Sequence, residues 1–178
     1  MTATATTAKA DSQHLFSGGF NSASGLNWTY SVSDSYANTY IVPAANSWNN
    51  ISSKVKLNKV TSGTYNIRAT LETTTVSGRL GLMTPYCTIN GVNSSGGACL
   101  SSPWGSAKVT AYSNQMSAFG MNTSNIISNY AHEFGHALSL AHVSGSPSTS
   151  PISVMKQGIQ SYLPQQTDKD HLKQKWGN

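Results

Sequence analysis

Apolar and polar residues alternate in several short stretches of the first two thirds of the chain, a period-two pattern that is typical of half-buried strands. Segment 65–71, Tyr-Asn-Ile-Arg-Ala-Thr-Leu, alternates most clearly. Segment 26–32 alternates in the same way, and 55–57, 79–86 and 108–112 are compatible with further strands. We therefore predict strands at these positions.

Two other stretches have an apolar period of three to four residues, which indicates helices. Ser33, Asp34 and Ser35 are good N-cap residues for the first, whose apolar positions are Tyr36, Tyr40, Ala44, Trp48 and Ile51. Pro43 either kinks this helix or marks its true start. The second stretch runs from 123 to 138 and carries Ile127, Tyr130, Ala131, Phe134 and Leu138.

The end of the chain predicts one more helix. Segment 143–151, Val-Ser-Gly-Ser-Pro-Ser-Thr-Ser-Pro, is incompatible with a helix. A last helix is expected from Thr167 to Trp176, with Asp170 as the capping-box partner of Thr167.

Strands followed by helices, in a mixed rather than strictly alternating order, predict an α+β fold. A chain of 178 residues suits one compact domain. We expect a flexible tail over residues 1–24 and a single domain over 25–178. The longest apolar run, 40–42, is far too short to span a bilayer, so we expect no membrane insertion.

Charged residues make up 10% of the chain and give a formal net charge of +5. The basic residues are scattered, without the basic stripe and interleaved aromatics of a nucleic-acid interface, so no nucleic-acid partner is expected. The acidic residues are Asp11, Asp34, Glu72, Glu133, Asp168 and Asp170. So few carboxylates disfavour glycoside hydrolysis, which needs an acidic pair, and a calcium site, which needs several carboxylate oxygens.

Cys87 and Cys99 flank a loop-like stretch rich in Gly, Ser and Asn. We predict that they form a disulfide, which indicates an oxidising compartment; the alternative is two unpaired buried thiols. Residues 8–10, Ala-Lys-Ala, resemble the small-x-small site of a signal peptidase. The sequence therefore favours a secreted, extracellular protein.

The chemistry is concentrated in His132-Glu133-Phe134-Gly135-His136, within the second predicted helix. Positions i and i+4 share a helix face, so His132 and His136 can direct ring nitrogens at one ion. Glu133 lies one step round the helix, within reach of a water on that ion without being a ligand. The alternative is a chance motif with a solvent-exposed His pair.

A third metal ligand has few candidates. No Glu follows Glu133, and the next Asp is Asp168, in the predicted last helix. His142 remains, six residues after His136, and a straight helix would point it away from the other two. The chain must therefore turn sharply near residue 139 for His142 to reach the same ion.

Segment 132–142, His-Glu-Phe-Gly-His-Ala-Leu-Ser-Leu-Ala-His, resembles the extended zinc-binding signature of the metzincin endopeptidases. Segment 153–155, Ser-Val-Met, resembles their Met-turn, and the end of the chain is similar to the closing helix of the matrixin branch. The resemblance covers about 25–177. It implies a metzincin-type zincin: a twisted mixed sheet, an active-site helix and a small helical C-terminal subdomain, with an upper subdomain over about 25–142 and a lower one over about 143–178.

The same resemblance implies the roles of the site residues. His132, His136 and His142 would bind one catalytic zinc ion. Glu133 would be the general base for attack of zinc-activated water on a peptide carbonyl. Met155 would form an apolar floor below the metal. A strand within 79–86 would border the cleft and pair with an extended peptide or protein substrate.

The chain departs from the family pattern in three ways. Ser139 stands where the family usually has Gly, which costs on the order of 1 kcal/mol if the backbone there is left-handed. The matrixin loops for calcium and a second zinc are absent, so no calcium is expected. No Tyr follows the Met-turn directly, and Tyr162 is the nearest candidate for contacting the oxyanion.

The function that we predict is that of a secreted, monomeric, single-domain zinc endopeptidase. Two alternatives stay open: another zinc hydrolase, such as a cell-wall peptide amidase, and a non-catalytic secreted binding module. Ser139 favours the binding module, whereas the intact Glu133 counts against it.

Overall fold

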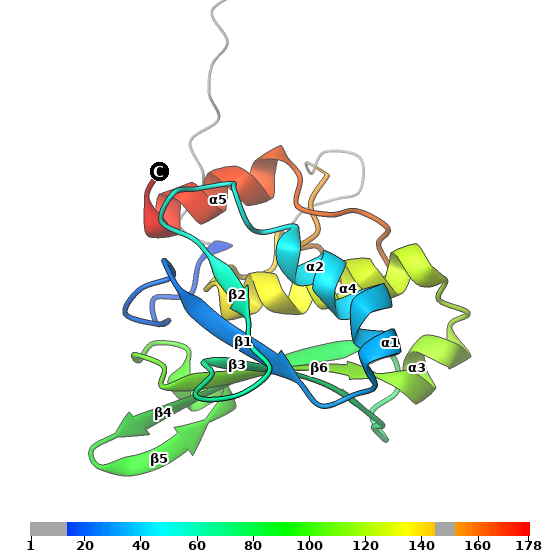
Figure 1. Cartoon of the computed structure of the whole chain (residues 1–178), viewed down its shortest axis with the longest axis horizontal. Helices are drawn as coiled ribbons and strands as arrows, with labels where there is room; N and C mark the ends of the chain where they lie inside the picture. The colour runs from blue at the N-terminus through cyan, green and yellow to red at the C-terminus, as the bar shows by residue number, and fades with distance from the viewer. Residues whose placement is uncertain (1–13, 145–151) are drawn as a thin grey trace, which may run out of the picture.

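The computed structural model describes residues 14–144 and 152–178. A six-stranded sheet with the strand order β2-β1-β3-β6-β4-β5 forms its base (Figure 1). The strands are β1 (Leu26–Tyr30), β2 (Leu57–Lys59), β3 (Ile67–Glu72), β4 (Gly81–Ile89), β5 (Val92–Ser95) and β6 (Ser106–Tyr112). β1 is parallel to β2 and β3, and β3 is parallel to β6, whereas β4 is antiparallel to both β6 and β5. The predicted mixed sheet with several helices is confirmed.

Four of the predicted strands lie within two or three residues of their expected bounds, and the short strand predicted at 55–57 begins at Leu57 instead. Strand β5 was not expected, although its signal is present in the sequence. Asn90 and Gly91 have φ values of 50° and 79°, the backbone shape of a two-residue hairpin turn. Cys87 therefore lies on a hairpin strand rather than in a loop. It forms the predicted disulfide with Cys99, at a Cα–Cα distance of 5.7 Å.

The helix predicted after Ser33 forms in three consecutive pieces: α1 (Asp34–Tyr36), the π-helical turn η2 (Ala37–Ile41) and α2 (Val42–Asn46). Ser33 Oγ accepts a hydrogen bond from the Tyr36 N–H (3.3 Å), which confirms the cap. Pro43 lies inside the helical segment, so the alternative that it starts the helix is wrong. Just before it, the Val42 N–H donates to the Ala37 carbonyl five residues back, and this wide turn accommodates the proline.

The first helical segment ends at Asn46, earlier than the predicted Ile51, and Asn50 has a φ of 65°. Trp48 is nevertheless fully buried, as its place in the apolar pattern predicted. Its indole Nε1–H donates to the Ala131 carbonyl on α4 (Thr123–Ala137) at 2.9 Å. The turn after α2 therefore fixes this segment against α4.

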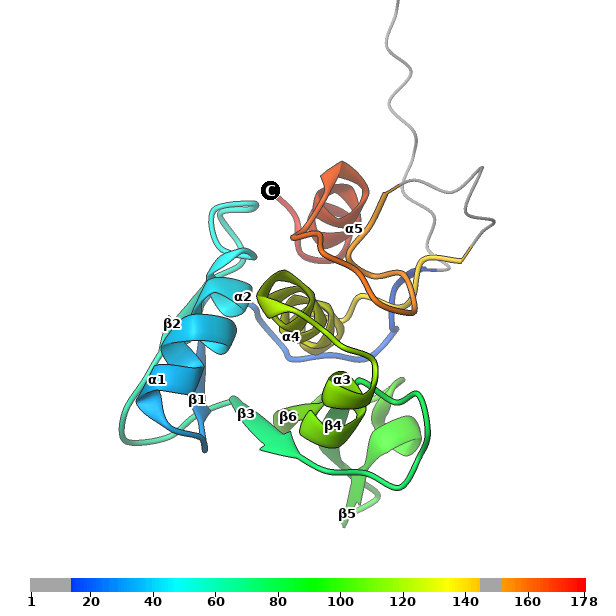
Figure 2. The same ribbon diagram turned by 90° about the vertical axis from the view of Figure 1, so that its right-hand side faces the viewer.

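Helix α4 (Thr123–Ala137) packs across the sheet and lies between it and α5 (Gln166–Trp176) (Figures 1 and 2). The rings of Trp28 on β1 and Phe134 on α4 meet edge to face, with centroids 5.5 Å apart. The described chain also contains two short elements that were not predicted, the 3₁₀ turn η3 (Gly96–Cys99) and α3 (Ser113–Ala118).

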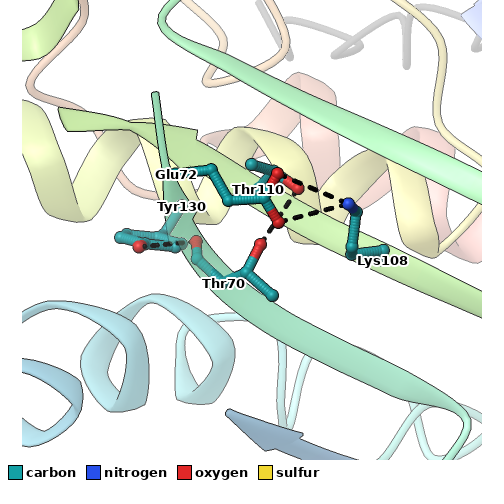
Figure 3. A network of polar contacts seen from close by, with 5 residues as sticks. All are labelled: Thr70, Glu72, Lys108, Thr110 and Tyr130. Carbon is teal, nitrogen blue, oxygen red and sulfur yellow. Dashed lines mark hydrogen bonds and ion pairs between the residues drawn. The ribbon is translucent and has the colours of Figure 1, made fainter. Parts of the chain in front are cut away.

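A polar network joins α4 to the centre of the sheet (Figure 3). The Tyr130 hydroxyl donates to the Thr70 carbonyl on β3 (3.1 Å). The Thr70 hydroxyl donates in turn to that of Thr110 on β6 (3.1 Å). Both threonines are buried, so these hydrogen bonds satisfy polar groups that would otherwise be costly. The nearby Lys108–Glu72 ion pair (3.2 Å) is more exposed and stabilises the fold little.

The prediction of a flexible tail over residues 1–24 is wrong for residues 14–24. Residues 1–13 lie outside the described part of the chain. Phe20 and Ala23 are buried. Leu15 forms an antiparallel bridge with Leu140, and Gly19 a parallel one with Pro103. These residues join the core through isolated bridges rather than a regular element, so their apolar side chains show no period in the sequence.

Helix α5 begins one residue before the predicted Thr167, and the predicted capping pair is wrong. Gln165 is the N-cap, and the Asp168 carboxylate accepts its backbone N–H (2.8 Å). Asp170 instead accepts from the Gln166 side-chain amide (2.8 Å). Of the segment predicted to be non-helical, residues 143 and 144 are irregular, and 145–151 lie outside the described residues.

Candidate metal centre

Helix α4 begins as predicted at Thr123. Its cap is reciprocal: the Asn122 side chain accepts the Asn125 N–H (3.0 Å), and the Asn125 side chain accepts the Asn122 N–H (3.1 Å). The buried Tyr130, Ala131 and Phe134 hold one face of the helix in the core. His132 and His136 project from this rigid element, with ring centroids 4.6 Å apart. The first two predicted ligands therefore lie side by side.

The sharp turn predicted near residue 139 is present. The helix ends at Ala137, and the Leu140 N–H bonds back to the Gly135 carbonyl (3.0 Å). Ser139 has a φ of 68°, the left-handed conformation that Gly adopts most easily. The serine thus adopts a backbone conformation that is more common for glycine. The turn brings His142 back to the other two histidines.

The three imidazoles meet at their Nε2 atoms. His142 Nε2 lies 3.1 Å from His132 Nε2 and 3.1 Å from His136 Nε2. On the far side of the rings, His132 Nδ1 bonds to the Val154 carbonyl (2.7 Å) and His136 Nδ1 to the Leu140 carbonyl (2.7 Å). A carbonyl only accepts, so each of these Nδ1 atoms carries a proton and each neutral ring turns its Nε2 lone pair inward.

Converging lone pairs repel one another unless a proton or a metal cation lies between them. Tetrahedral zinc with Zn–N bonds of about 2.0–2.1 Å holds two nitrogens roughly 3.3 Å apart, close to the observed spacing. Among the described residues, His132, His136 and His142 form a group whose ligand atoms all lie within 4.8 Å of one another. The donor set therefore fits a divalent transition metal such as zinc.

Burial keeps the histidines neutral, as metal binding requires. Loss of hydration lowers the pKa of His132 to about 4, although its hydrogen bond to Val154 acts in the opposite direction. Burial also lowers the pKa of His136 well below its usual value, and His132 and His142 add to the effect. His142 is the most exposed of the three, and its partial burial also lowers its pKa.

Glu133 is buried beside this site, with 5% of its surface exposed. Burial raises its pKa to about 8, against the smaller opposing effect of a hydrogen bond from the Met83 backbone N–H. Its Oε2 atom has no hydrogen-bond partner among the described residues. A buried carboxylate with a free oxygen beside three imidazoles is suited to accepting and releasing a proton.

Met155 packs under helix α4, against Gly135. It is fully buried, and its carbonyl accepts the Val143 N–H (3.0 Å), just after His142. Gly135 makes room for it, because a Cβ at Gly135 would lie 3.2 Å from Met155 Cε and 2.8 Å from Trp48 Cζ2. The Gly within the His-Glu-Phe-Gly-His motif thus has a packing role.

An open cleft of about 550 Å³ reaches His132, Glu133 and His142. Three segments form most of its walls: the residues that lead into β4, one face of α4, and the residues around and after Met155. Their lining residues are Ser77, Gly78, Arg79, Leu80, Gly81, Met121, Asn125, Ser128, Asn129, Val154, Gln157, Gly158 and Gln160. Tyr162 is 41% exposed and is not one of the residues lining the cleft, so the structure gives no support to an oxyanion contact from it.

Comparison with protein-family models and with curated protein sequences finds no match. The fold is similar to solved structures. One structure of myroilysin matches with a TM-score of 0.58 at 16% identity, over 93% of this chain and 98% of that one. A second matches with 0.55 at 17%, over 90% and 86%. A chain of the GM1-bound ECX AB5 holotoxin matches with 0.53 at 13%, over 85% and 80%. At these identities the likeness shows the fold alone.

Two residues of the site were missed from the sequence. Asp168 is fully buried and binds the segment just before Met155: its carboxylate accepts the Val154 N–H (2.9 Å) and a short hydrogen bond from the Ser153 hydroxyl. An acidic residue in the first turn of a helix was the available signal. Gly81 lies against the Glu133 carboxylate. Nothing in the sequence indicated that contact.

Proposed function

We propose that the protein is a secreted zinc-dependent endopeptidase of the metzincin type, similar to the matrixin branch. One observation carries the proposal: three neutral imidazoles converge at Nε2 distances of 3.1 Å beside a buried carboxylate, at the wall of an open cleft. All three histidines come from one chain, so a monomer is sufficient for activity.

In the proposed reaction the histidines bind the metal and Glu133 transfers the proton. His132, His136 and His142 would hold the zinc ion in their neutral forms. When bound, zinc supplies Lewis-acid activation of water and of the scissile carbonyl, and its charge favours the ionised form of Glu133. Glu133 then accepts a proton from the attacking water at its carboxylate and passes it to the leaving amine. Burial excludes competing water from this proton transfer.

Strand β4 supplies the binding surface for an extended peptide. It pairs with β6 along Gly81–Tyr86, but β5 covers its other edge only from Tyr86 onward. Over Gly81–Pro85 that second edge has no strand partner within the described chain, and the first residue of this stretch, Gly81, lines the cleft. A free strand edge pairs with extended main chain, which favours unfolded or loop segments as substrates.

A secreted location is supported by the Cys87–Cys99 disulfide, because such bonds persist in oxidising compartments. Within residues 14–144 and 152–178, no helix has the length and apolar character that crossing a membrane requires.

The test is degradation of a denatured, fluorescently labelled protein by the zinc-loaded chain, with and without a chelator. We expect chelator-sensitive cleavage at internal bonds that is lost in Glu133→Ala. Glu72→Ala is the matched control, since it removes a carboxylate that pairs with Lys108, away from the cleft. Cleavage that survives Glu133→Ala would contradict the assigned base. Tight zinc binding without cleavage would favour a cell-wall peptide amidase or a binding module instead.

A further inference from the structure

Residues 14–19, here called the N-terminal strap, run along the outside of the loop that carries His142. Two backbone hydrogen bonds join them: the Phe16 N–H to the Ser139 carbonyl (2.9 Å) and the Ala141 N–H to the His14 carbonyl (2.7 Å). They make the antiparallel bridge between Leu15 and Leu140. The strap therefore pairs with the loop between the second and third histidines.

Side chains of the strap also contact the histidines themselves. His14 Nδ1 donates to the backbone carbonyl of His142 (2.9 Å). The Phe16 ring is stacked on the His136 imidazole, with centroids 5.7 Å apart and planes inclined by 28°. Two of the three imidazole-bearing residues are thus contacted by a segment more than a hundred positions away in sequence.

The strap leaves room for the side chain of Ser139. Its side chain is fully buried, and a Cβ at Gly19 would clash with its hydroxyl oxygen. Gly19 has a φ of 147°, in the region that L-residues rarely adopt. The serine that replaces the family's glycine at the turn is therefore accommodated by a glycine in the strap.

Lys175 anchors the strap to the last helix. Its Nζ donates to three successive strap carbonyls, those of Phe16 (2.7 Å), Ser17 (3.3 Å) and Gly18 (2.9 Å). The next residue, Trp176, donates its indole N–H to the Leu138 carbonyl at the end of α4 (2.8 Å). Helix α5 thus holds both the strap and the start of the turn.

We propose that the N-terminal strap, which is held by Lys175, positions the loop that carries His142. In this way the strap sets the affinity of the site for the metal. The proposal rests on the metal site proposed above. His132 and His136 sit on a rigid helix, whereas His142 follows a turn, and two of the backbone bonds of that turn go to the strap. A ligand loop that is not held in place must be ordered at the moment of binding, which weakens affinity.

The test compares zinc affinity in Lys175→Met and Lys173→Met, both in the full chain. Both changes remove one lysine from α5 in the same way, but only Lys175 binds the strap. Affinity is measured by competition of the metal-free proteins with a chromophoric chelator. We expect zinc binding about 10-fold weaker in Lys175→Met and unchanged in the control, the usual scale for a residue that supports a ligand.

A second variant and a spectroscopic readout separate positioning from general stability. His14→Ala removes the hydrogen bond to the His142 carbonyl and leaves the Lys175 anchor intact. We expect weaker zinc binding in this variant too. The visible spectrum of the cobalt(II)-substituted variants should also change, because it reports the ligand geometry directly. Thermal unfolding of the metal-free proteins is recorded in parallel.

Unchanged zinc affinity and an unchanged cobalt spectrum in both strap variants would overturn the proposal. So would a loss of thermal stability without any loss of affinity, because the strap would then only brace the fold. A wild-type chain that binds zinc tightly but cleaves no protein would refute the peptidase function and leave this inference standing. A wild-type chain that binds no zinc would refute both.

Discussion

Gly81→Ala should disable the proposed general base without disturbing the metal. Gly81 is the first residue of β4, and a Cβ there would lie 2.6 Å from Glu133 Oε1 and 2.9 Å from its Cγ. Ordinary contact begins at 3.4 Å, so the carboxylate oxygen must move by about 0.8 Å. It is the end of a side chain, so the fold can yield here by shifting Glu133 instead of the strand.

The expected effect on catalysis is large because proton transfer depends on position. A displacement of about 1 Å can cost roughly 100-fold in rate. We therefore expect kcat/KM to fall about 10- to 100-fold in Gly81→Ala, which corresponds to about 1.4–2.7 kcal/mol of transition-state stabilisation. Zinc affinity should stay unchanged, because the three atoms nearest to the added methyl group all belong to Glu133.

The assay is hydrolysis of a quenched fluorescent peptide, with zinc affinity measured on the same preparations. Gly25→Ala is the matched control, since a Cβ at Gly25 has nothing within 4 Å. Adding Gly81→Ala to a Glu133→Ala chain should cause no further loss of residual activity. The reasoning is refuted if Gly81→Ala retains full kcat/KM, or if it lowers activity equally in the Glu133→Ala background.

Three further results are expected. Gly135→Ala should lower the free energy of unfolding by about 1–3 kcal/mol in urea titrations, because the new methyl group collides with Met155 below the helix; an unchanged midpoint would contradict this packing. Reduction of Cys87–Cys99 should cost about 3 kcal/mol in the same titration and leave zinc bound; metal loss in step with reduction would instead indicate a cysteine ligand. In the metal-free protein, burial raises the pKa of Glu133 to about 8, so its stabilising contribution is complete below about pH 4.5 and is lost as the pH rises through 8. The free energy of unfolding of Glu133→Gln, relative to that of the wild type, should therefore rise by about 3 kcal/mol between pH 5 and pH 8. An equal difference between the two proteins at both pH values would rule out a raised pKa for Glu133.

Regular elements were predictable from the sequence wherever one face of the element is buried. The alternation at 65–71 and the helical period at 123–138 correspond to β3 and α4, because each packs one face on the core. The hairpin strand β5 is largely exposed and buries neither face, so its residues do not alternate between apolar and polar in a way that predicts a strand. Its Asn90–Gly91 turn was the signal that was overlooked.

The candidate site was predictable for a similar reason. His132 and His136 are four residues apart on one helix, so their meeting follows from helix geometry alone. For His142 to reach the other two histidines, the chain had to turn near residue 139, and the structure contains this turn at Ser139. The roles of Asp168 and Gly81 were not predictable, because each depends on which distant segment packs against it.

By itself, the sequence determined the period of each buried element, the ligand spacing within α4 and the pair of cysteines available for a disulfide. These are local properties, set by residues within one or two turns of one another. Only the tertiary structure decided that residues 14–19 cross the chain to bind the His142 loop, and that Lys175 holds them there. The contacts between residues 14–16 and the His142 loop join backbone groups from distant parts of the chain, and Lys175 also binds backbone carbonyls. Since every residue except proline carries the same backbone donor and acceptor, no pattern of side chains records which of them will pair.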